Sequence, residues 1–241
     1  MFQIKGQKAR LYTGKVKGII MSDFLYGLSV WAIPLVLCMV VHELAHGYIA
    51  LKLGDKTALR AGRLTLNPVA HIDPMGSIFL PLILVLSSSP VLFGWAKPVP
   101  VNFNALNRPK RDMGLVAAAG PLSNILLAVI FVFFGKVVLE IVPIHSPLFM
   151  WLKDNIANGI LFSLVLAVFN LLPILPLDGG RILVSVLPKK LAYQYQQTEG
   201  YGMYILLGLM VLPFVLGINV IGWFLGSIIP YLYSFIMWLA F

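Results

Sequence analysis

The chain has 241 residues, of which 59% are hydrophobic and only 11% charged, and its mean hydropathy is +0.90. These values exclude an ordinary soluble domain and place the chain in a lipid bilayer as a multi-pass protein. The formal net charge of +9 does not indicate a nucleic-acid partner, because no basic helix face or aromatic stacking pattern accompanies it and basic loops are usual in membrane proteins.

The first strong helix is expected over 28–53, where an apolar stretch runs until Gly54 stops it. The basic stretch 1–17 precedes it, and the apolar run that follows is too long for a removable signal peptide and has no small-residue cleavage site. From residue 56 to 73 the pattern changes to short alternation closed by Asn67-Pro68, which predicts a strand or hairpin.

A second apolar run, 76–93, contains Pro81 and a Ser-Ser-Ser-Pro break at 87–90, so it is compatible with one crossing or with a re-entrant hairpin. Residues 94–101 carry Pro98 and Pro100 and are expected to be extended at an edge, because each proline removes a backbone donor.

Further helices are predicted in the second half of the chain, at 111–138, 148–172, 201–216 and 220–239. The expected fold is an α-class polytopic membrane bundle of about five spanning helices, with a re-entrant segment and a small membrane-associated β element. We expect one domain over 1–241, with a catalytic core at about 28–181 and extra C-terminal helices at 201–239.

One short motif interrupts the first apolar helix. His42 and His46 are four residues apart, which places both imidazoles on one helix face at a spacing that suits a single zinc ion. Glu43 lies about 100° further around the helix, within reach of a metal-bound water whose pKa the zinc lowers towards 7. Metal, nucleophile and general base for peptide hydrolysis are thus all predicted from five residues.

Two other interpretations of this motif are a catalytically silent scaffold that holds membrane proteins and a metal transporter that uses the same ligands. A silent relative is expected to lack Glu43 or a ligand, whereas both are present. A transporter usually shows repeated halves, and the chain shows none. Burying two histidines and a glutamate in an apolar helix costs several kcal/mol unless they are paired or coordinated, which favours a functional site over a chance pattern.

A catalytic zinc needs a third protein ligand and an open position. Cys38, the only cysteine, lies one turn before His42, too far along the helix for one ion to bridge, and is expected in the core. His71, Asp73 and His145 lie beside prolines in apparent turns. Asp178 is the better candidate, because prolines before it open the helix and two glycines after it let a carboxylate turn inward, although an interfacial aspartate is the alternative.

Three motifs in order resemble the site-2 protease family of intramembrane zinc metalloproteases, peptidase M50. They are the His-Glu-Leu-Ala-His-Gly stretch at 42–47, the Ala-Gly-Pro-Leu-Ser-Asn stretch at 119–124, and 170–180, from Asn-Leu-Leu-Pro to Leu-Asp-Gly-Gly. The chain resembles a compact member, without a recognisable PDZ or CBS domain.

The resemblance implies one Zn²⁺ per chain, with Asp178 as third ligand and Glu43 as general base. It also implies cleavage of transmembrane protein substrates, substrate contacts by Asn124 and Asn170, and a β edge near the metal, for which 56–66 and 94–101 are candidates. Asn124 and Asn170 could instead pack between helices as hydrogen-bonding amides. A bacterial or archaeal cell membrane is the expected location.

The ligand positions also predict a topology. His42 and Asp178 both lie toward the C-terminal ends of their helices, so the 28–53 and 148–172 helices should run in the same direction. Since the 111–138 helix is one crossing, the 76–93 segment should dip into the membrane and return.

Overall fold

A computed structural model describes residues 3–79, 82–83, 86 and 94–240 of the protein. Within these residues five helices are long and apolar enough to cross a membrane. They are α1 (Gln3–Lys52, apolar from Ser22), α4 (Pro109–Ile141), α5 (Pro147–Asn170), α8 (Glu199–Leu216) and α9 (Val220–Ala240). The predicted helical membrane bundle with about five spanning helices is confirmed.

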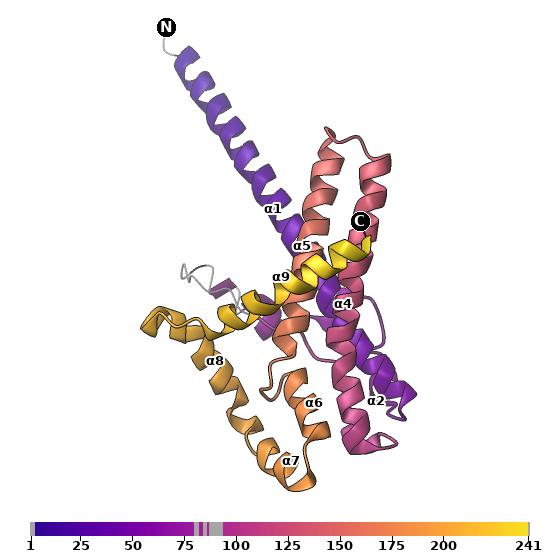
Figure 1. The fold of residues 1–241 in the computed structure, drawn as a ribbon. Coiled ribbons are helices and arrows are strands. Elements are labelled where there is room, and N and C mark those ends of the chain that lie inside the picture. The colour runs from indigo at the N-terminus through magenta and orange to yellow at the C-terminus, as the bar shows by residue number, and fades with distance from the viewer. Residues whose placement is uncertain (1–2, 80–81, 84–85, 87–93, 241) are drawn as a thin grey trace.

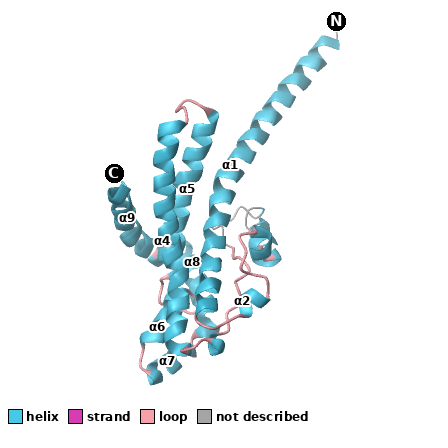
Figure 2. Ribbon diagram, turned by 90° about the vertical axis from the view of Figure 1, so that its right-hand side faces the viewer, coloured by secondary structure: helices cyan, strands magenta, loops and turns pink. Residues whose placement is uncertain are grey.

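Helices α1, α4 and α5 pack against one another and form the centre of the molecule. As predicted, α1 and α5 run in the same direction, and α4 runs antiparallel to both (Figure 2). A short turn joins α4 to α5, and Ser146 caps the start of α5 by accepting a hydrogen bond from Phe149 N at 3.1 Å. The buried core between α4 and α5 includes Ala128, Val132, Ile156, Ile160 and Leu164.

The strand or hairpin predicted from residue 56 to 73 is wrong, because this segment begins with the short helix α2 (Thr57–Arg60) and contains no strand. The Asp55 carboxylate accepts hydrogen bonds from the backbone amide and the hydroxyl of Thr57, which favours a helical turn at this point. Gly62 has a φ of +65° just after it, a backbone conformation that strands do not adopt. The alternation of apolar residues here reflects a folded loop and not a sheet.

The following segment contains the 3₁₀ turns η1 (Pro68–His71) and η3 (Phe103–Ala105) and the π-helical turn η2 (Pro74–Phe79). Residues 94–101 form no helix, as predicted, but the described part of the chain contains no β-strand, so the predicted β element is not found there. The predicted re-entrant segment 76–93 falls largely outside the described residues.

Two short helices that the sequence analysis did not predict follow α5, namely α6 (Asp178–Val186) and α7 (Lys189–Gln196). They lie at the same end of the bundle as the C-terminus of α1 (Figure 1). A glycine pair makes this arrangement possible: a Cβ on Gly179 would overlap the backbone of Leu171, and a Cβ on Gly180 would lie 2.7 Å from Leu175 N. The first turn of α6 can therefore pack directly against the loop that leaves α5.

Helices α8 and α9 form the periphery of the molecule. Gly217, with a φ of +71°, ends α8, and α9 then crosses α5 and α4 on the outside of the bundle (Figure 1). Ile236 of α9 is buried in the cluster formed by α4 and α5. Most other side chains of the two helices are exposed in the monomer, as expected for helices that face lipid.

Candidate metal centre

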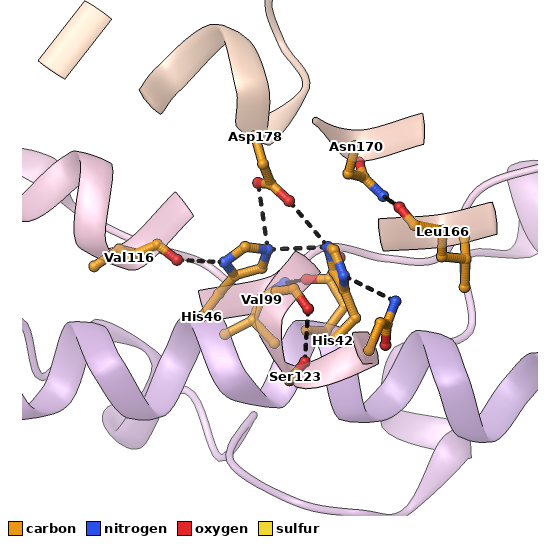
Figure 3. Close-up of polar contacts among 11 residues, drawn as sticks. His42, His46, Val99, Val116, Ser123, Leu166, Asn170 and Asp178 are labelled. Atoms are coloured by element: carbon orange, nitrogen blue, oxygen red, sulfur yellow. Dashed lines mark hydrogen bonds and ion pairs between the residues drawn. The ribbon is translucent and has the colours of Figure 1, made fainter. Parts of the chain in front are cut away.

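The two histidines of the predicted zinc motif lie on the face of α1 that packs against α4. Their Nε2 atoms are 3.1 Å apart, with the rings at 85° to each other (Figure 3). The side chain of His42 is buried, and that of His46 is nearly so. The helical spacing of four residues thus brings two nitrogen donors together, as the sequence predicts.

Asp178 supplies the third donor as the first residue of α6. Its Oδ2 lies 3.2 Å from His42 Nε2, and its Oδ1 lies 3.4 Å from His46 Nε2. The proximity of Oδ2 to the imidazole does not amount to a well-oriented hydrogen bond, so this buried oxygen has no hydrogen-bond partner in the protein. An orphaned carboxylate oxygen in such a place is explained by a cation between the three side chains.

The donor set fits zinc in type and in spacing. One ligand atom from each of His42, His46 and Asp178 lies within 4.8 Å of the others. Tetrahedral coordination with bonds of about 2.0–2.1 Å places neighbouring ligand atoms roughly 3.4 Å apart, close to the separations found here. Two imidazoles and one carboxylate leave a fourth position open, which is typical of catalytic and not of structural zinc sites.

Helix α4 forms the wall behind the two imidazoles. The carbonyl of Val116 lies 2.7 Å from His46 Nδ1. Because a carbonyl can only accept, Nδ1 of His46 carries the hydrogen and its Nε2 lone pair faces Asp178. One turn further along, Gly120 leaves room for both rings, since a Cβ there would lie 2.6 Å from His42 Nε2 and closer still to His46 Nε2.

Asn124 lies on the same face of α4, one turn beyond Gly120. Its side chain is 0% exposed, and its Nδ2 is placed 3.3 Å from His42 Nδ1. The predicted substrate residue Asn124 is thus brought into the metal cluster. By contrast, Nδ2 of Asn170, at the end of α5, donates to the carbonyl of Leu166 one turn earlier (Figure 3).

Glu43 is held by the segment 94–101, which forms a second wall of the site. Its Oε2 accepts a hydrogen bond from Val99 N at 2.7 Å. Gly47, one turn along α1, permits this approach, because a Cβ there would lie 3.0 Å from Val99 Cγ1 and overlap the Leu64 side chain. Sequence reasoning missed Val99 as a partner of Glu43; the glycine that ends the zinc motif is the signal that could have indicated a close approach.

The residues that follow α1 bind the residues that follow this segment at two points. Asn107 N donates to Leu53 O at 2.8 Å, and Asn102 N donates to the buried Asp55 Oδ2 at 2.7 Å. Burial by itself raises the pKa of the Asp55 carboxyl, but hydrogen bonds from Thr57 and Asn102 outweigh it and hold the pKa below its ordinary value. Asp55 is therefore ionised, and in this form it stabilises the wall that carries Val99.

The other candidate ligands from the sequence lie outside the cluster. Cys38 is buried with its Sγ 3.1 Å from Ser163 Oγ, in keeping with the expected core role. His71 lies in η1 with Nε2 2.9 Å from Thr65 O, and Asp73 accepts a hydrogen bond from Gly76 N at 2.8 Å. His145 is in the turn between α4 and α5. The last three have the turn positions that their neighbouring prolines predict.

Comparisons with known proteins point to a zinc metalloprotease. A family model described as "Peptidase family M50" matches residues 140–213, a range that includes Asp178. "Putative zinc metalloprotease YwhC" of Bacillus subtilis is 42% identical over 80% of this chain and 87% of its own length. "Putative zinc metalloprotease Rip2" of Mycobacterium tuberculosis is 29% identical over 85% of this chain and 72% of its own length. "Zinc metalloprotease MJ0392" of Methanocaldococcus jannaschii is 26% identical over 80% of this chain and 46% of its own length. No solved structure matches the chain.

Proposed function

Because this chain belongs to peptidase family M50, the site-2 protease family, we propose that it hydrolyses peptide bonds in or near the transmembrane segments of other membrane proteins. The protein is a zinc metalloendopeptidase and an integral, multi-pass membrane protein. What supports cleavage within the bilayer is the position of the donor cluster. His42 and His46 lie inside the apolar span of α1, and the helix that packs behind them, α4, is itself a spanning helix.

In this proposal His42, His46 and Asp178 hold one Zn²⁺. The metal supplies Lewis-acid chemistry and lowers the pKa of a bound water. Glu43 would act as the general base, taking a proton from the attacking water and later giving it to the leaving amine. Val99 N binds one carboxylate oxygen of Glu43, which leaves the other oxygen to accept the proton. The amide thus orients the base without occupying both of its oxygens.

We propose that Asn170 contacts the substrate, on the basis of its position. It lies at the C-terminal end of α5, where the chain turns toward Asp178, and its side chain is only partly buried. Its hydrogen bond to its own helix can be exchanged for one to a substrate backbone. A substrate segment must be extended for its peptide bond to reach the metal, so its freed backbone groups need such partners. We also propose that residues 1–241 act as one domain, with the core at about 28–181.

The test is to measure zinc content and cleavage of a generic transmembrane substrate by the purified protein, in wild type, Glu43→Gln and Asp178→Ala. We expect one zinc per chain in wild type. Glu43→Gln should keep the zinc and lose about 100-fold or more of the cleavage rate, because a general base is dispensable for coordination. Asp178→Ala should weaken zinc binding, since it removes a ligand.

Glu140→Gln is the matched control, because this exposed carboxylate lies on α4 near the opposite end of the bundle from the cluster. It should change neither zinc content nor cleavage. Zinc binding that survives Asp178→Ala unchanged, or cleavage that survives Glu43→Gln, would overturn the proposed roles. A metal transporter would instead tolerate Glu43→Gln and lose zinc transport with Asp178→Ala.

A further inference from the structure

Asn124 is in contact with a proposed metal ligand and not with open space. Its side chain is fully buried in the packing between α4 and α1, and its amide lies 3.3 Å from His42 Nδ1. The other amide atom is also buried and has no hydrogen-bond partner in the protein. Packing alone would therefore favour leucine at this position, and the contribution of the amide has to come from its contact with His42.

The direction of this hydrogen bond follows from the geometry around His42. Its Nε2 faces Asp178 at 3.2 Å and His46 Nε2 at 3.1 Å, so a metal in the cluster uses the Nε2 lone pair. A neutral imidazole with a free Nε2 carries its hydrogen on Nδ1, so the atom facing Nδ1 must be an acceptor. The oxygen and nitrogen of an amide have nearly the same shape, and the amide in its other orientation presents Oδ1 to Nδ1.

One face of α4 meets the Nδ1 atoms of both histidines. Val116, Gly120 and Asn124 are spaced four residues apart and therefore share a face of the helix. Val116 O accepts from His46 Nδ1, Gly120 gives the rings room, and Asn124 faces His42 Nδ1. We infer that Asn124 is a positioning residue that accepts a hydrogen bond from His42 Nδ1 and so keeps the Nε2 lone pair of His42 directed at the metal. This inference rests on the proposed metal centre and assigns Asn124 a role other than substrate binding.

The test measures the zinc dissociation constant by competition with a chromophoric chelator, in wild type, Asn124→Leu and Asn124→Asp. Leucine has a similar volume but no acceptor, so zinc affinity should fall about 10- to 100-fold, the usual effect of losing an outer hydrogen bond to a ligating histidine. Aspartate offers only acceptors, so it should retain affinity within a few-fold of wild type. Asn155→Leu is the matched control, because Asn155 is another buried amide with an unpartnered oxygen, located on α5 and bonded to Trp151 O. It should leave zinc affinity unchanged.

A second readout is the tautomer of His42 itself, observed by nitrogen NMR of zinc-loaded protein labelled at histidine. Wild type and Asn124→Asp should show His42 protonated at Nδ1 and protected from exchange, and Asn124→Leu should lose that protection. The inference is overturned if Asn124→Leu binds zinc as tightly as wild type, or if Asn124→Asp loses affinity as strongly as Asn124→Leu. A wrong assignment of the metal centre itself would give a different result, because zinc would then bind to Asp178→Ala as tightly as to wild type.

Discussion

The two walls of the site are built differently. The α4 wall is part of a packed helix pair and touches the proposed metal ligands at three successive turns, through Val116, Gly120 and Asn124. The other wall is the segment 94–101, which contains no helix or strand, and its Val99 N binds Glu43 by one backbone hydrogen bond. The difference indicates that metal binding and proton transfer are supported separately, so each should be removable with limited damage to the other.

The largest effect, a loss of zinc affinity, is expected when a larger side chain is placed in the α4 wall. In Gly120→Ala the new Cβ would lie 2.6 Å from His42 Nε2 and closer to His46 Nε2, so the two rings have to move apart. Zinc affinity should fall about 100-fold, the upper range for overpacking a tight site, and cleavage should fall with it. Zinc content after dialysis against a chelator is the measurement.

Gly135→Ala is the control for this substitution, because it makes the same change on the same helix. Its Cβ would lie 3.5 Å from Ile156 Cγ2, an ordinary contact, so zinc binding and activity should be unchanged. If both variants kept their zinc, packing of α4 against the histidines would not limit zinc affinity. Metal binding would then not depend on the α4 wall.

A smaller effect should follow from changing the 94–101 wall at Val99. Val99→Pro removes the amide that binds Glu43, whereas Val99→Ala keeps it. Loss of a hydrogen bond to a charged group costs roughly 1.5–3 kcal/mol, so the cleavage rate should fall about 10- to 100-fold in Val99→Pro. Zinc content should stay at the wild-type level in both variants, as measured on the same samples.

Val99→Ala should cleave nearly as fast as wild type. Equal activity in the two Val99 variants would show that Glu43 does not depend on this amide. Loss of zinc in Val99→Pro but not in Val99→Ala would show that the two walls are coupled and do not support metal binding and proton transfer separately.

The sequence predicts the α4 side of this comparison better than the loop side. Long apolar runs determine where the spanning helices lie, and the spacing of His42 and His46 places both rings on one face of α1. Asp178 could be singled out because prolines and glycines surround it. The contact between Asn124 and His42 could not, because the register of α4 against α1 is set by side-chain packing across the pair and not by either helix alone.

The loop side depends on interactions that leave little trace in residue patterns. The alternation in 56–66 resembles a strand, but the Asp55 side chain and Gly62 override it and favour α2. The bond from Val99 N to Glu43 uses a backbone amide, which every residue except proline has, so residue type gives no indication of it. The short helices α6 and α7 were also missed, since neither is long enough for its periodicity to stand out.

The smallest of the three effects is expected at Asp55, which follows α1 and binds Asn102 N directly after the 94–101 wall. Its pKa in the folded protein lies below the ordinary value, so its contribution to stability is complete above about pH 4 and is lost as the pH falls through the lower folded pKa. Asp55→Asn should lower the free energy of unfolding at pH 7 by about 2 kcal/mol, because hydrogen bonds from Thr57 and Asn102 lose their charged acceptor. Unfolding in detergent at pH 7 and at pH 3 measures the loss of stability and its dependence on pH.

The difference in unfolding free energy between Asp55→Asn and wild type should shrink at the lower pH. The control Asp23→Asn, at an exposed position on α1, should leave stability unchanged at both pH values. A difference that is the same at both pH values would mean that Asp55 acts through its shape and not through its charge, and that the 94–101 wall is held by packing.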